Sequence, residues 1–325
     1  AVMSQPLHSL GAQHTAQDAA LLMSRHGIRH VPVADDSGRV VGILSERDLF
    51  ALQRLSLKQV SSAIRAAADV PTLQHVAADI RRFARNLLGQ GVQARQLTEL
   101  ISHLNDVLTE RLVTLIAGQH QIDLARVCWL AFGSEGRSEQ TIATDQDNGI
   151  VFASDDAALE RTRLLAFARD VNEALDACGY PLCKGNVMAS NPECCLTQAE
   201  WLARFASWID HGAPEDLLNA SIYFDARALA GAAALVTPMR ELVSAQAGRN
   251  ARFMKQMADN ALRNGPALTW TGAIDTHTQG DQQVIDLKLH GTAIYVDAAR
   301  LFALAHGLAA TGTRARFEAA AQAMR

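Results

Sequence analysis

The sequence predicts a multi-domain protein of mixed α and β structure (α/β, α+β). The 325 residues are about twice the length of a typical single domain. Helix and strand patterns alternate in residues 1–60, whereas residues 63–120 and those after residue 200 are mainly helical. In the middle of the chain, residues 127–132 are expected to form a continuous apolar strand and residues 148–152 a second strand.

The composition argues against several classes of protein. Hydrophobic residues make up 49% and charged residues 20%, which is the balance of a globular chain. No apolar run approaches the roughly 18 residues of a membrane-spanning helix. A net charge of −4 argues against bulk binding to nucleic acid or anionic lipid. The five cysteines include no C-x-x-C pair, so we expect free thiols in the cytoplasm.

The first 60 residues combine one helix with two strands. A helix capped by Thr15 and stopped by Gly27 comes first. Two apolar strands, residues 28–33 and 39–44, follow it, and a second helix begins near Ser45.

The helical segment that follows has one apolar face. Leucine, isoleucine and valine recur at spacings of three and four between Leu97 and Leu115. This face could pack against a neighbouring domain or pair two copies of the chain. The second alternative is one reason to expect a homodimer.

Residues between the two central strands indicate the chemistry. A polar turn, Gly133-Ser134, follows the first strand, and Asp145-Gln-Asp147 precedes the second. Two carboxylates at i and i+2 of an extended chain point to the same side, where they repel each other unless a cation binds. Oxygen ligands suit Mg²⁺ (or Mn²⁺), which also binds substrate phosphates. A Gly-Ser turn offers N–H groups and a hydroxyl to phosphate. We therefore predict phosphoryl or nucleotidyl transfer, with Asp145 and Asp147 as catalytic metal ligands.

This motif resembles a known superfamily. A Gly-Ser turn, ten residues and then Asp-x-Asp is similar to the pattern of the polymerase-beta nucleotidyltransferases. The string Gly133-Ser-Glu-Gly-Arg-Ser-Glu-Gln-Thr-Ile-Ala-Thr-Asp-Gln-Asp-Asn148 looks closer to one branch, which includes the bacterial PII-protein uridylyltransferase and nucleotidyltransferases attached to CBS modules. The resemblance implies transfer of a nucleoside monophosphate from a nucleoside triphosphate to an acceptor hydroxyl, with a protein among the candidate acceptors.

The N-terminal region resembles one CBS motif. The match lies in His30-Val-Pro-Val33 and Gly42-Ile-Leu-Ser-Glu-Arg-Asp48. It implies an adenine-nucleotide ligand, with Ser45 at its phosphate and Asp48 at its ribose, although both residues could equally cap a helix. CBS motifs work in pairs and only one is visible. Because the chain also begins at Ala1 without a Met, we expect a truncated N-terminus.

The C-terminal third resembles the helical substrate-binding region of the same group. The match lies in Tyr223-Phe-Asp-Ala-Arg227, Gln256-Met-Ala-Asp-Asn260, Ile285-Asp-Leu-Lys-Leu-His-Gly291 and Ala298-Ala-Arg300. It implies that Asp286, Lys288 and Arg300 orient a nucleotide or an acceptor. An internal ion-pair network is the alternative for these three residues.

Two further basic residues are candidate phosphate contacts. Arg137 could neutralise a phosphate or pair with Glu139, and Lys184 belongs to a strand expected at residues 182–189. Many members of the superfamily have a third carboxylate on that strand, and this sequence has none there; Asn186 is the nearest polar candidate.

The predicted domains are a CBS motif (residues 1–60), a helical connector (61–126), a nucleotidyltransferase core (127–198) and an all-helical substrate-binding domain (199–325). The predicted function is a signal-transduction nucleotidyltransferase regulated through the CBS motif. The missing third carboxylate motivates an alternative, a nucleotide-sensing module that acts on a partner protein. In a third hypothesis the protein is a scaffold and the aspartate pair is only structural.

Overall fold

The computed structural model describes residues 7–89, 91–269 and 271–325. The protein has mixed α and β structure, as the sequence predicts, and separates into two compact units, Ala1–Ala63 and Ile64–Arg325. Among the described residues, no helix combines the length and the apolar character that crossing a membrane requires.

The N-terminal unit contains a three-stranded sheet in the order β1-β2-β3, with β2 and β3 antiparallel. Its helix α1 begins after Thr15, which forms a reciprocal capping box with Asp18, and ends at Gly27 in the left-handed conformation (φ 62°). Both predicted strands are present within two residues of their expected ends. The elements are β1 (Leu10–Gly11), α1 (Ala16–His26), β2 (His30–Ala34), β3 (Val40–Ser45) and α2 (Glu46–Ala66).

The second unit is built around a four-stranded sheet in the order β6-β5-β4-β7. Strand β4 is antiparallel to both β5 and β7, and β5 is parallel to β6. The two predicted central strands are present, and every residue of both is buried. The strands are β4 (Val127–Ala131), β5 (Asn148–Phe152), β6 (Cys195–Thr197) and β7 (Arg227–Gly231).

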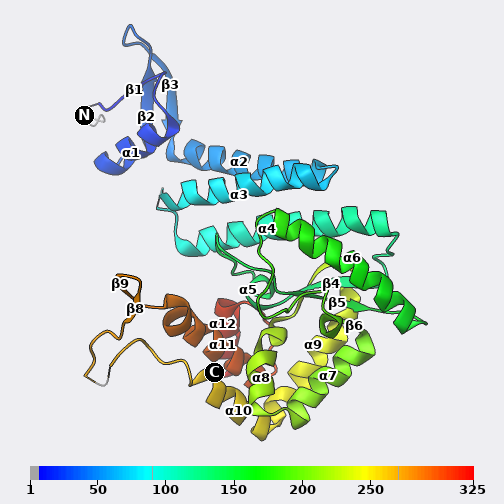
Figure 1. The fold of residues 1–325 in the computed structure, drawn as a ribbon. Helices are drawn as coiled ribbons and strands as arrows, with labels where there is room; N and C mark the ends of the chain where they lie inside the picture. The colour runs from blue at the N-terminus through cyan, green and yellow to red at the C-terminus, as the bar shows by residue number, and fades with distance from the viewer. Residues whose placement is uncertain (1–6, 90, 270) are drawn as a thin grey trace. The chain divides into compact units, whose positions relative to one another are not determined.

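Helices cover both faces of this sheet (Figure 1). On one face, Trp129 packs edge to face against Phe167 of α6. On the other face, Leu130 joins a core that includes Trp201 of α7 and Met239 of α9. The helices and turns of this unit are α3 (Val70–Gly89), α4 (Ala94–His120), α5 (Gly133–Gly136), α6 (Ala157–Ala177), η1 (Pro192–Cys194), α7 (Gln198–His211), α8 (Pro214–Ala220), η2 (Ser221–Asp225), η3 (Ala233–Leu235), α9 (Thr237–Gln246), η4 (Ala247–Arg249), α10 (Ala251–Ala261), η5 (Lys288–Thr292), α11 (Ala293–Ala305) and α12 (Thr313–Ala323).

The apolar face of α4 is buried within the chain. It packs against α3, α6 and β7, and Leu97, Leu108 and Leu112 are at most 6% exposed. This face is therefore used inside one chain, and it does not provide the homodimer surface that the sequence left open.

Two local predictions were wrong. Residues 182–189 form turns rather than a strand, because Asn186 adopts a left-handed φ of 56° and its N–H closes a turn onto the carbonyl of Cys183. The segment 199–325 is not all helical.

Two pieces of β structure interrupt the C-terminal segment. Strand β7 pairs with the free edge of β4 and so belongs to the central sheet. A short hairpin, β8 (His277–Gln279) and β9 (Gln282–Val284), precedes η5. The sheet core therefore extends past residue 198, because β4 needs a partner on each side to satisfy its backbone groups.

Two glycines give a test of this packing. A Cβ atom at Gly136 would lie 2.2 Å from the carbonyl oxygen of Asp225 and 2.9 Å from that of Ala131, and backbone cannot move aside. No described atom would lie within 4 Å of a Cβ at Gly118, in α4. We expect Gly136→Ala to destabilise the protein by about 1–3 kcal/mol and Gly118→Ala to stabilise it by about 0.5–1 kcal/mol. Urea denaturation of both variants measures these changes, and equal midpoints would contradict the packing.

Candidate functional site

The aspartate pair lies where the chain enters β5. Burial alternates along residues 145–148: Gln146 and Asn148 are 2% and 1% exposed, whereas Asp145 is exposed and Asp147 is half-buried. This alternation follows from the extended backbone, whose successive side chains point to opposite sides. One side of the segment is anchored in the core, and the two carboxylates share the other side.

Buried amides anchor the inner side of this segment. Gln146 donates to two backbone carbonyls, those of Asn172 and Tyr180. Asn172 in turn donates to Gln146 (2.8 Å) and Asn148 (3.0 Å). This network was not predicted from the sequence. The pattern that could have indicated it is two amides, Gln146 and Asn148, that alternate with the two aspartates, together with Asn172 inside the apolar stripe of α6.

The Gly133-Ser134 turn forms the short helix α5 directly beside Asp147. The N–H of Phe132 donates to the carbonyl of Asp147 (2.8 Å), which joins the start of the turn to the aspartate segment. Gly133 has a left-handed φ of 51°, and a Cβ atom there would lie 2.9 Å from Oδ2 of Asp147. Glycine is required at this position on both counts, and the turn and the carboxylate are in close contact.

The electrostatics of Asp147 favour a cation. Burial, reinforced by the neighbouring Asp145, raises its pKa to about 7, although Cys183, Lys288 and Arg137 act in the opposite direction. The positive charge of Lys288, from η5, thus acts on Asp147 across a long separation in sequence. Among the described residues, no three His, Cys, Asp or Glu side chains form a metal site. The two carboxylates fit a hard cation whose remaining ligands are phosphate oxygens and water.

A third acid, Glu135, lies in α5 and was not singled out from the sequence. It is 6% exposed, and its carboxylate makes no hydrogen bond among the described residues. Burial and the nearby Asp106 raise its pKa to about 8, while Arg227 lowers it. Arg227 donates to Asp106 (2.8 Å) and to the backbone carbonyl of Glu135 (2.9 Å), which ties the turn to helix α4.

Asp225 is the centre of a buried ion-pair cluster. It is 0% exposed and accepts hydrogen bonds from three arginines, Arg137, Arg300 and Arg316, at 2.6–3.1 Å. Burial would raise the pKa of Asp225, but the guanidinium groups of Arg300 and Arg316 hold it well below its usual range.

Two outer carboxylates complete this cluster. Glu139 pairs with Arg137 (2.9 Å) and accepts from the hydroxyl of Thr313 (2.9 Å). Asp297 pairs with Arg300 (2.6 Å). Arg137 and Arg300 therefore both form internal ion pairs, which was one of the two alternatives that the sequence left open for each of them.

The other candidate residues lie on the surface. Lys184 is exposed on the same turn as Cys183. Asp286 is exposed and accepts from the N–H of Leu289 (2.9 Å), so it caps the next turn of helix. In the N-terminal unit, Ser45 and Asp48 form a reciprocal capping box, with Ser45 Oγ 2.6 Å from the Asp48 carboxylate. The capping alternative is the one that the structure shows for that pair.

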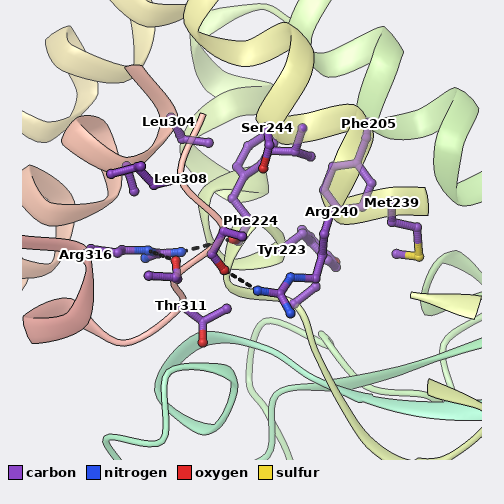
Figure 2. A pocket seen from close by; sticks show the side chains of 15 residues that line it. Phe205, Tyr223, Phe224, Met239, Arg240, Ser244, Leu304, Leu308, Thr311 and Arg316 are labelled. Carbon is purple, nitrogen blue, oxygen red and sulfur yellow. Dashed lines mark hydrogen bonds between the residues drawn. The ribbon is translucent and has the colours of Figure 1, made fainter. Parts of the chain in front are cut away.

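Arg316, a member of the Asp225 cluster, lines a pocket together with Phe224 and Leu308 (Figure 2). Its volume is about 460 Å³, which includes open solvent. Arg316 borders it and donates to the carbonyl of Phe224 (3.2 Å). The walls are mainly apolar, and neither Asp145 nor Asp147 lines it. This pocket is therefore separate from the aspartate site.

Comparison with known families identifies three segments. Residues 78–215, which contain the turn and the aspartate pair, match the family described as "Putative nucleotidyltransferase DUF294". Residues 251–325 match "Putative nucleotidyltransferase substrate binding domain", and residues 1–54 match "CBS domain". The comparison with curated proteins found no match.

These matches indicate the class of protein. The site lies in the segment that matches the putative nucleotidyltransferase family, and the chain combines this match with matches to a CBS domain and to a C-terminal substrate-binding domain. This is the architecture that the sequence motifs predicted. Asp225 and strand β7 lie between the two nucleotidyltransferase matches, so the centre of the ion-pair cluster is outside both.

Removing the charge of Asp225 should strongly destabilise the protein. Asp225→Asn leaves three buried or half-buried guanidinium groups without their shared anion, so we expect a loss of about 3–5 kcal/mol. The control is Asp259→Asn, which breaks an exposed pair with Lys255 and should change stability by less than about 1 kcal/mol. Urea denaturation measures both, and a small effect of Asp225→Asn would contradict the central role of the cluster.

The burial of Glu135 should make the stability of the fold depend on pH. The pKa of Glu135 is raised from 4.5 to about 8 in the folded protein. Its contribution to the free energy of unfolding is therefore fully present below about pH 4.5 and is lost as the pH rises through about 8. We expect Glu135→Gln to melt at a higher temperature than the wild type at pH 9, with the difference shrinking toward pH 5. The exposed Glu318→Gln is the control, and parallel profiles for wild type and Glu135→Gln would contradict this assignment.

Proposed function

We propose that the protein transfers a nucleoside monophosphate from a nucleoside triphosphate to an acceptor hydroxyl, with Mg²⁺ or Mn²⁺ at Asp145 and Asp147. The observation that supports this most directly is the close approach of Asp147 to the Gly133-Ser134 turn, inside the segment that matches the putative nucleotidyltransferase family. When bound, the cation supplies Lewis-acid stabilisation of the charge on the phosphates.

The protein groups then have separate roles. The backbone N–H groups of the turn and the hydroxyl of Ser134 bind phosphate, while Lys288 adds positive charge from the substrate-binding domain. The acceptor oxygen forms its bond to the α-phosphorus as the bond to pyrophosphate breaks. Burial of Gln146 and Asn148 keeps Asp145 and Asp147 in place during this step, because the segment between them cannot rotate without breaking the amide network.

The other domains suggest regulation and acceptor choice. We propose that the CBS domain binds an adenine nucleotide and that this binding changes activity, and that the C-terminal domain selects an acceptor, with a protein as the first candidate. UTP is the first donor to test, from the resemblance to PII-protein uridylyltransferase.

A nucleotide sensor is the second candidate function. It is favoured by the absence of a three-carboxylate metal cluster among the described residues. In this case the same site would bind Mg²⁺ and nucleotide without releasing pyrophosphate.

The test measures pyrophosphate release from each labelled nucleoside triphosphate with Mg²⁺ and cell extract at pH 8, where Asp147 is ionised. We expect Asp145→Asn and Asp147→Asn each to lower the rate at least about 100-fold. The control is Asp155→Asn, whose side chain is fully exposed. Mg²⁺-dependent nucleotide binding without release would favour the sensor, and no nucleotide binding would overturn both functions.

A further inference from the structure

The turn after α6 is fastened to the aspartate segment on both sides of Asp147. The N–H of Gln146 donates to the carbonyl of Pro181, and the N–H of Asn148 donates to the carbonyl of Val187, both at 3.1 Å. Residues 181–187 are therefore held beside Asp147 by backbone bonds that do not depend on any side chain.

Cys183 lies in the middle of this turn. Its Sγ is 3.4 Å from Oδ1 of Asp147. The backbone around it is also held, because the Cys183 carbonyl accepts from the N–H of Asn186 (3.0 Å) and its N–H donates to the sulfur of Met188 (3.4 Å). The distance from Sγ to Oδ1 is within hydrogen-bond range for sulfur, and the thiol S–H donates to the carboxylate oxygen.

The two oxygens of Asp147 face different partners. Oδ1 meets Cys183, whereas Oδ2 lies against the Gly133 turn, 2.9 Å from the position of a Cβ at that glycine. One carboxylate is thus oriented from two sides, with the thiol on one side and the turn that would hold phosphate on the other.

We propose that Cys183 is a positioning residue, which holds Oδ1 of Asp147 and thereby directs Oδ2 toward a cation and the phosphates at the Gly133 turn. This inference rests on the proposed function, which assigns Asp147 as a cation ligand. Residues 182–189 contain no third carboxylate, and in this proposal Cys183 has a different role on that segment. Its thiol does not bind the cation but orients Asp147, which does.

The test compares Cys183→Ser, which keeps a donor, with Cys183→Ala, which removes it. Titration calorimetry measures Mg²⁺ binding in the presence of a non-hydrolysable UTP analogue, and pyrophosphate release gives kcat and KM. We expect Cys183→Ala to weaken Mg²⁺ binding by about 2- to 12-fold, the equivalent of one hydrogen bond. Cys183→Ser should stay within about 2-fold of the wild type. Cys178→Ala, which removes a buried thiol at the end of α6, is the control for lost packing.

A second measurement does not require metal or activity. Carbon-13 NMR titration of Asp147 in the metal-free protein should give a higher pKa in Cys183→Ala than in the wild type and Cys183→Ser, because the hydrogen bond from Cys183 lowers it. Wild-type values for Cys183→Ala in both measurements would overturn the positioning role, as would equal losses in the Ala and Ser variants. Absence of Mg²⁺–nucleotide binding in the wild type would instead overturn the proposed function, and the titration would still show whether Cys183 holds this carboxylate.

Discussion

Asp225 is a fully buried carboxylate, and a buried charge is tolerated only when its hydrogen-bonding capacity is satisfied. Its two oxygens accept four hydrogen bonds, two of them from the fork of Arg300 and one each from Arg137 and Arg316. These arginines come from the end of α5, from α11 and from α12. One carboxylate therefore joins the Gly133 turn to helices α11 and α12, and the position of each of these elements depends on the others.

The geometry of the candidate site depends on this ion-pair cluster around Asp225. Gly136 lies so close to the carbonyl of Asp225 that no side chain fits between them, and Arg137 follows it in the chain. The other end of the turn is bound to Asp147 through the N–H of Phe132. Docking of the C-terminal helices also explains how Lys288, far along the sequence, comes to influence the pKa of Asp147.

The buried acids of this region differ because their partners differ. Asp225 is surrounded by guanidinium groups and has a lowered pKa. The half-buried Asp147 and the buried Glu135 lie near other carboxylates, and their pKa values are raised. The negative charge at the aspartate site is thus only partly compensated by the nearby protein groups Lys288 and Arg137. A divalent cation bound at Asp145 and Asp147 would offset this negative charge, and Cys183 orients the Asp147 carboxylate that would bind it.

The sequence by itself determined the features that are local along the chain. The two central strands, the cap and stop of α1 and the aspartate pair beside its turn follow from hydrophobic period, capping residues and short spacing. Only the tertiary structure decided which residues meet across long separations. Strand β7 is recognised only by its pairing with β4. Asp225 lies 88 residues from Arg137, and Asp147 lies 36 residues from Cys183. Such contacts leave no periodic pattern, because they depend on how whole elements pack and not on the residues that surround each partner in the chain.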